Sequence, residues 1–142
     1  MSNKMPRVDS EFLEGVLESI RRRSKALKHR NAKPAIERFL EVQEDHFEER
    51  IEIRIDIRPR QTLRLKLWSD RFIDVWAAES VWQAGWKFQY QKSGRFVGGI
   101  DGRKIVGAIE ESLSAMFEMT ADDTSELEQT WKPLLASGPS AL

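Results

Sequence analysis

The sequence has no cysteine among its 142 residues, which excludes disulfides, thiol nucleophiles, cysteine-bound zinc and iron–sulfur clusters. Histidine is scarce as well, because His29 and His46 are the only two, so a histidine-based metal site would need both of them together with carboxylates. No apolar run approaches the roughly 20 residues that a membrane-spanning helix needs. The first seven residues also lack the apolar core of a secretory signal. We therefore expect a cytoplasmic protein without disulfides that makes no contact with a membrane.

A net charge is also absent, because 23 basic residues balance 23 acidic ones. The charges are nevertheless unevenly distributed along the chain. Residues 21–33 carry seven basic and no acidic side chains, whereas residues 101–128 carry eight acidic and two basic side chains. A basic segment of this kind can bind a polyanion such as nucleic acid. Two helices with oppositely charged solvent faces explain the asymmetry more simply, so nucleic-acid binding through residues 21–33 is our second alternative.

Signatures of catalytic and cofactor sites are absent too. There is no G-x-S-x-G nucleophile elbow, and the glycine-rich turn before Arg103 and Lys104 matches neither the phosphate-binding nor the dinucleotide-binding pattern. His46 stands among acidic residues, but Gln43 occupies the position where a helical di-metal centre would need a glutamate. We therefore expect a protein that is not an enzyme, with no catalytic residue, no metal site and no cofactor.

The clearest pattern in the sequence is a run of four isoleucines that alternate with four charged residues between Ile51 and Arg58. Only a β-strand places such a set on one face. Shorter runs with the same period follow, and they predict further strands separated by turns. Pairing Ile53 with Leu67, and Leu67 with Ile73, keeps all inward side chains on one face, as a meander requires. The expected strands cover residues 51–57, 63–67, 73–77 and 86–90, with a turn at 92–94 before a short fifth strand at 95–97.

Apolar residues at helical spacing predict helices on both sides of these strands. The second N-terminal helix has Ile36, Phe39, Leu40 and Phe47 as its apolar stripe. Side chains that can accept backbone hydrogen bonds mark where the helices begin. The predicted caps are Asp9 or Ser10 for the first helix, Asn31 for the second and Asp101 for the third, and a short helix follows at residues 125–131.

Together these elements predict an α+β fold with two N-terminal helices, an antiparallel meander sheet of four to five strands, and a C-terminal helix packed on the sheet. Residues 1–119 would form a single domain, and residues 120–142 a C-terminal segment with a short helix and then a frayed tail. This order of elements resembles that of small bacterial partner-binding proteins, such as toxin-neutralising immunity proteins and secretion chaperones. The resemblance is one of architecture, and it implies a protein that works by binding another protein.

The outward side of the predicted sheet holds the candidate binding residues. If the aliphatic side chains point inward, three large aromatic residues point outward among basic ones, where polar side chains would suffice. Tryptophan and arginine are enriched at binding hot spots. We therefore expect a non-enzymatic protein–protein interaction module, which is also compatible with a homodimer. Its predicted contact residues are Arg64, Lys66, Trp68, Phe72, Trp76 and Trp82.

Two other interpretations use the same aromatic residues. A C-terminal segment containing Leu127 and Trp131 could cover the outward face and make it part of the core. Alternatively, a strongly curved sheet could enclose a small-molecule pocket, or the active site of an enzyme. The residues that would line such a pocket are Trp76, Trp82, Trp86, Phe88 and Tyr90.

Overall fold

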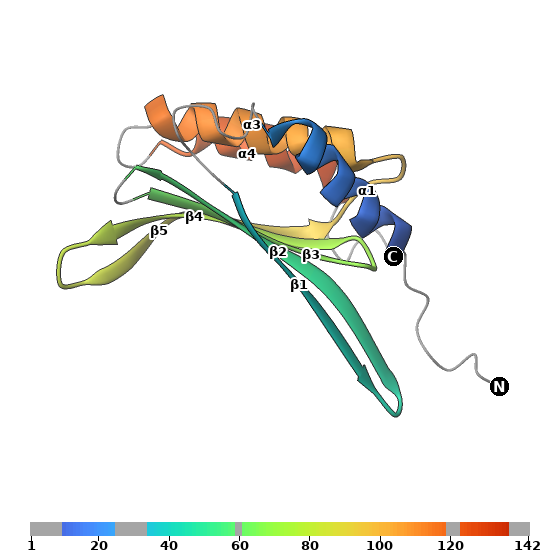
Figure 1. Cartoon of the computed structure of the whole chain (residues 1–142). Coiled ribbons are helices and arrows are strands. Elements are labelled where there is room, and N and C mark those ends of the chain that lie inside the picture. The colour runs from blue at the N-terminus through green and yellow to red at the C-terminus, as the bar shows by residue number, and fades with distance from the viewer. Residues whose placement is uncertain (1–9, 25–33, 59–60, 119–122, 137–142) are drawn as a thin grey trace.

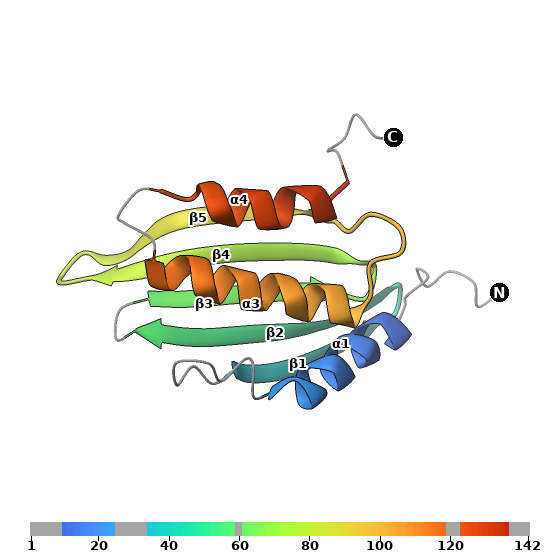
Figure 2. The same ribbon diagram turned by 90° about the horizontal axis from the view of Figure 1, so that it is seen from above.

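The computed structural model describes residues 10–24, 34–58, 61–118 and 123–136 of the chain. Within these residues, one helix precedes a sheet of five strands, and two helices follow it. Figure 1 and Figure 2 show two layers, with all three helices on one face of the sheet, so the fold is α+β. The elements are α1 (Ser10–Arg22), β1 (Pro34–Gln43), β2 (His46–Arg58), β3 (Gln61–Trp68), β4 (Phe72–Val81), β5 (Gly85–Arg95), α3 (Gly102–Glu118), α4 (Ser125–Trp131) and the 3₁₀ turn η3 (Lys132–Leu134).

The five strands form one antiparallel meander in the order β1-β2-β3-β4-β5. The isoleucines of β2 and the leucines of β3 are buried, in agreement with the predicted alternation. Leu67 pairs with Ile73 as expected. Ile53, however, lies opposite Leu65, and Ile51 lies opposite Leu67, so the predicted pairing of Ile53 with Leu67 is wrong by two residues. Because the shift is even, the same side chains still face the core.

The three helices bury their apolar stripes on the inward face of the sheet. Asp101 caps α3, since its Oδ1 accepts hydrogen bonds from the backbone N–H groups of Arg103 (3.0 Å) and Lys104 (3.2 Å). α3 approaches α1 so closely at Gly102 that a Cβ there would overlap the carbonyl group of Gly15. The fully buried side chains include Leu13 and Val16 from α1, Ile105 and Ile109 from α3, and Leu127 and Trp131 from α4.

The predicted second N-terminal helix is wrong, because its apolar residues lie in β1 and at the start of β2. Ile36, Phe39 and Leu40 are spaced three and four apart, as on a helix, but Ile36, Leu40 and Val42 also share one side of a strand. All ten residues of β1 pair with β2. This backbone ladder outweighs the helical preference of the glutamates between the apolar residues. Residues 25–33, which include the predicted cap of that helix, lie outside the described part.

The last strand also differs from the prediction. β5 continues through residues 92–94, predicted as a turn, because all three pair with β4. Phe96 then forms a single antiparallel bridge with Leu135 instead of a short strand at 95–97. The residues predicted as a frayed tail beyond 136 lie outside the described part.

The C-terminal segment is tied to the edge of the sheet at β5. α4 occupies residues 125–131, where the sequence predicts a short helix. After it, the Val97 N–H donates to the Leu134 carbonyl (2.9 Å) and the Ala136 N–H donates to the Arg95 carbonyl (2.8 Å). No helix in the described part of the chain combines the length and the apolar character needed to cross a membrane.

Candidate functional site

The face of the sheet opposite the helices is not covered by any described element (Figure 1). Leu127 and Trp131, which could have covered it, lie in α4 on the other side and belong to the core. Large aromatic side chains occupy outward positions of β3, β4 and β5 on this uncovered side, and an exposed tryptophan lies in the turn between β4 and β5. We call this set the aromatic face, and its members are Trp68, Phe72, Trp76, Trp82, Trp86 and Phe88.

Three rings cluster where β4 pairs with β5. Trp76 packs edge-on against Phe88, with ring centroids 5.2 Å apart at 84°, and against Trp86, with centroids 6.5 Å apart at 67°. The guanidinium carbon of Arg64 lies 5.6 Å from the centroid of Trp76, within cation–π distance. Trp86 and Phe88 nevertheless keep 47% and 56% of their surface exposed. The cluster is therefore held in place by its neighbours and still available for contact.

A β-bulge places Trp86 and Phe88 on this face. The register between β4 and β5 shifts between Ala77 and Ala78, so that Tyr90 lies opposite Ala77 on the core side and Phe88 lies opposite Ala78 on the outward side. The alternation of residues 86, 88 and 90 in the sequence contains no sign of this shift. The predicted pocket lined by five aromatic residues is therefore not formed, because Tyr90 points to the other side of the sheet.

Tyr90 instead takes part in a hydrogen-bonded cluster that connects β5 to α4. Its hydroxyl donates to Glu128 Oε1 (2.8 Å), and Lys92 Nζ donates to Glu128 Oε2 (3.1 Å). Burial, together with the bond to the carboxylate, raises the pKa of Tyr90 well above its ordinary value. The hydrogen bonds from Tyr90 and Lys92 lower the pKa of Glu128. At neutral pH neither the Tyr90 hydroxyl nor the Glu128 carboxylate changes its protonation. These hydrogen bonds therefore hold α4 in position, and the pair is not suited to acid–base catalysis.

A second pair of rings flanks the turn between β3 and β4. The centroids of Trp68 and Phe72 lie 5.6 Å apart at 68°. The guanidinium carbon of Arg95 lies 5.7 Å from the Phe72 centroid, and Arg95 Nη2 donates to Asp70 Oδ2 (2.8 Å). Trp68 and Phe72 are both partly buried. This end of the aromatic face is thus more enclosed by its own neighbours than the cluster around Trp76.

Ordered charges border the rings on β2 and β3. Arg64 Nη2 donates to Glu52 Oε1 (3.1 Å), and Arg50 Nε donates to Glu52 Oε2 (3.0 Å). The guanidinium carbon of Arg50 also lies 4.4 Å from the ring centroid of Phe39. Burial raises the pKa of Glu52, but the hydrogen bonds from Arg50 and Arg64 outweigh it and leave the pKa below its ordinary value. These charges are therefore held in defined positions beside the aromatic cluster.

The predicted contact residues are largely brought together. Five of them occupy outward positions of β3 and β4, and the sixth, Trp82, is 77% exposed in the turn between β4 and β5. Sequence reasoning extended this surface over the loop at residues 79–86 but did not name Trp86 or Phe88 as contact residues, because their face depends on the bulge. The five residues on the two strands are Arg64, Lys66, Trp68, Phe72 and Trp76.

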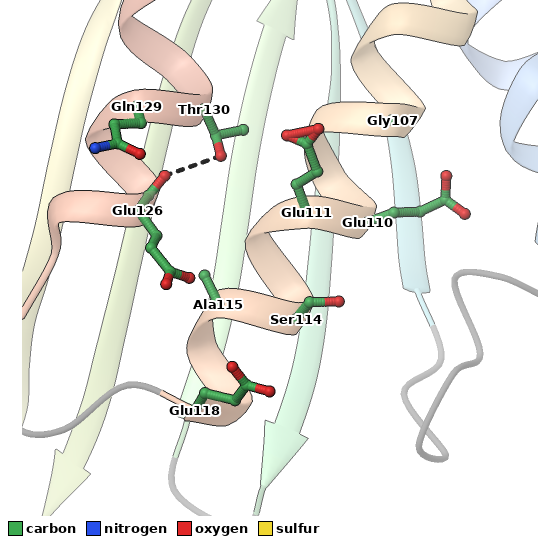
Figure 3. Close-up of a pocket in the computed structure, with 9 residues that line it drawn as sticks. All are labelled: Gly107, Glu110, Glu111, Ser114, Ala115, Glu118, Glu126, Gln129 and Thr130. Carbon is green, nitrogen blue, oxygen red and sulfur yellow. Dashed lines mark hydrogen bonds between the residues drawn. The ribbon is translucent and has the colours of Figure 1, made fainter.

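A polar groove lies between α3 and α4 on the helical side of the molecule (Figure 3). It carries four glutamates and no basic side chain among the residues that line it. Glu110 is paired with Arg23 (3.1 Å), and the Thr130 hydroxyl donates to the carbonyl of Glu126 (2.9 Å). The groove lacks the mainly apolar lining of a small-molecule site. Its lining residues are Gly107, Glu110, Glu111, Ser114, Ala115, Glu118, Glu126, Gln129 and Thr130.

The hairpin of β1 and β2 brings three potential metal ligands together. A ring nitrogen of His46 and carboxylate oxygens of Glu41 and Glu48 lie within 4.8 Å of one another. Glu48 is ion-paired with Arg50, which would have to release it. A tightly held metal ion also needs outer groups that orient its histidine ligand, whereas His46 is exposed with Glu41 beside it, 4.0 Å away. We therefore assign these residues to the charged surface of the hairpin.

The basic segment at residues 21–33 is described only as far as residue 24. Arg21 and Arg22 both pair with Glu18, at 3.7 Å and 3.2 Å, and Arg23 pairs with Glu110 of α3 at 3.1 Å. In the described part, each of these arginines thus has an acidic partner. The contact between Arg23 and Glu110 is of the kind expected for two oppositely charged helices that attract each other.

Comparison with protein-family models, with curated proteins and with solved structures finds no match for this chain. The function therefore has to be inferred from the chain's own surfaces. Among these surfaces, the aromatic face combines exposed aromatic side chains with neighbouring basic residues, and no element in the described part of the chain covers it.

Proposed function

We propose that this protein is a non-enzymatic protein–protein interaction module that binds another protein through its aromatic face. The observation that carries the proposal is the exposure of Trp82, Trp86 and Phe88 beside a sheet surface that no described helix covers. Large apolar side chains that gather on an exposed surface mark interaction sites. Trp and Arg, both present here, are the residue types most enriched at binding hot spots.

The shape of the surface supports a macromolecular partner over a small molecule. The rings stand on an open sheet, in which the hairpin of β4 and β5 extends past the helices and the hairpin of β1 and β2 bends away from them (Figure 1). A small ligand needs a concave cleft that buries most of its surface. A protein partner can instead cover the rings with an apolar patch of its own and place acidic groups near Arg64 and Lys66.

The contacts within the aromatic face also favour binding. Trp76 is held by Phe88 and Trp86, and Arg64 is held by Glu52. Ordering a free side chain on association costs about 0.5–1.5 kcal/mol. Because these side chains are already restrained in the free protein, most of that cost does not arise when a partner binds.

The specific form of this proposal is an immunity-type or chaperone-like role. Proteins of both kinds act by covering a surface of their partner, and neither needs a catalytic residue or a cofactor. A sheet surface with fixed aromatic anchors and an ordered polar border is suited to such a task.

The proposal can be tested with a triple variant, Trp82→Ala, Trp86→Ala and Phe88→Ala. We expect affinity capture from the native cells to enrich a specific protein on the wild-type chain and to lose it on the triple variant. A matched control is the triple variant Glu111→Ala, Glu118→Ala and Gln129→Ala, which removes three exposed side chains from the helical side.

The control variant should retain the captured protein, and both variants should unfold cooperatively. A protein that is captured equally well by the wild type and the aromatic triple variant would contradict the proposal. So would the absence of any enriched protein on the wild-type chain.

A further inference from the structure

The outer edge of β1 is not paired with any described strand. β1 is the first strand in the order of the sheet, and its ten residues pair with β2 without a shift in register. The opposite edge, β5, contains a bulge and is partly closed by Leu135 and Ala136. A long regular edge presents a row of free backbone N–H and C=O groups, which can template another strand. β1 is therefore the better edge for adding a strand.

Apolar side chains of β1 are exposed on the side of the sheet that carries the helices. Ile36 is 36% exposed, Leu40 62% and Val42 60%. They alternate in phase with the buried isoleucines of β2, but the hairpin bends away from the helical layer (Figure 1). Between them, Arg38 is held by ion pairs to Glu14 of α1 and Glu49 of β2. The exposed edge is thus accompanied by exposed apolar side chains of the same strand.

We propose that a second copy of this chain docks on this edge, by antiparallel pairing of the two β1 strands about a two-fold axis at Leu40. The two five-stranded sheets would then continue into one, with both helical layers on the same side. This surface is separate from the aromatic face, so the dimer and the partner proposed above do not compete for the same residues.

The charges on β1 select this register. In an antiparallel pair, two residues that lie directly opposite each other point to the same side of the sheet. A two-fold axis between two identical strands therefore passes through one residue of β1, which lies opposite its own copy. An axis at Arg38 would place two arginines opposite each other, and an axis at Glu37 or at Glu41 would place two glutamates opposite each other. An axis at Phe39 would place Glu37 opposite Glu41. Like charges directly opposite each other destabilise a pair.

An axis at Leu40 avoids all of these repulsions. It pairs residues 37–43 of the two copies and leaves Pro34, which has no N–H to donate, outside the paired stretch. The two Leu40 side chains meet at the centre, on the side where both are now exposed. The remaining pairs are Arg38 with Val42, Phe39 with Glu41, and Glu37 with Gln43. Axes closer to either end of β1 would pair only a short stretch.

The small area of the proposed β1–β1 contact limits the affinity of the dimer. Stable complexes bury about 1,200–2,000 Å², and the pairing of one short edge buries less. We therefore expect a weak dimer whose population rises with concentration. Sedimentation of the wild type should shift toward the dimer at up to about 1 mM protein, where an association worth about 4 kcal/mol is substantially populated. Leu40→Lys, which sets two cations opposite each other, should remain monomeric.

The absence of cysteine allows a direct test of the register. Directly opposite residues in an antiparallel pair have Cα atoms about 4.5–5.5 Å apart, which lies in the range that a disulfide can bridge. Leu40→Cys should therefore form a covalent dimer under mild oxidation. In the same register the two copies of residue 37 lie six residues apart along the strands, or roughly 20 Å. Glu37→Cys should accordingly stay monomeric and serves as the control.

Both variants change an exposed side chain, and circular dichroism can confirm that each remains folded. Equal crosslinking at positions 37 and 40 would overturn the proposed register, and a wild type that stays monomeric at about 1 mM would overturn the second copy as the occupant. In the latter case the edge is either free or used by a strand of a different protein. None of these results bears on the aromatic face, because the capture experiment changes other residues.

Discussion

Replacing Trp131 with alanine should remove a large part of the stability of this fold. The Trp131 side chain is fully buried between α4 and the rest of the core, and its Nε1 donates to Ser112 Oγ (2.8 Å). Truncation of a buried tryptophan costs about 3–5 kcal/mol. Ser112 also donates to the Ala108 carbonyl (2.8 Å), so the change leaves no unsatisfied donor. We therefore expect a loss of about 4 kcal/mol in the free energy of unfolding.

Urea titration followed by circular dichroism measures this loss. With a slope of about 2 kcal/mol per molar urea, the midpoint should fall by roughly 2 M. The matched control is Gln129→Ala, an exposed position on the same helix, which should change the stability by no more than about 0.5 kcal/mol. A loss below about 1 kcal/mol for Trp131→Ala would refute the reasoning, because α4 would then unfold independently of the sheet.

Three further perturbations probe other contacts. Gly102→Ala should destabilise the protein by about 1–3 kcal/mol in a thermal melt, because its Cβ would overlap α1; Gly107→Ala on the same helix has open space and should be neutral or stabilising by up to about 1 kcal/mol. Because the pKa of Tyr90 is raised in the folded chain, its contribution to stability is present below about pH 10 and is lost as the pH rises further. Tyr90→Phe should therefore show a shallower fall in unfolding free energy above pH 10, and an identical pH profile would contradict this role. Finally, Trp86→Ala combined with Phe88→Ala should lose no more than about 2 kcal/mol in urea titration, and a larger loss would place both rings in the core.

The clearest success of sequence reasoning is β2. Its isoleucines alternate with charged residues over eight positions, and no other regular structure buries such a set on one side. Once β2 is placed, the inward and outward faces of β3 and β4 follow from the same period. The side that carries Arg64, Trp68 and Trp76 could thus be recognised from the sequence, although the pairing of Ile53 was expected two residues away from its actual position.

The failure at β1 has a definable physical cause. The segment from residue 34 to residue 43 contains apolar residues that satisfy both a helical and a strand period, and its glutamates favour a helix. An edge strand has only one neighbour, which bonds half of its backbone N–H and C=O groups, so its conformation depends on that neighbour. The unpaired edge and the exposed Leu40 and Val42, on which the proposed dimer rests, were therefore not foreseeable.

The sequence by itself determined the local period of β2, β3 and α3, and with it the composition of the core, because burial of apolar side chains follows directly from periodicity. Tertiary structure decided which side of the sheet the helices cover, and so left the aromatic face uncovered. It also decided, through one bulge between Ala77 and Ala78, that Trp86 and Phe88 join that face while Tyr90 does not. A bulge depends on how two strands fit together, and no period within either strand contains that information.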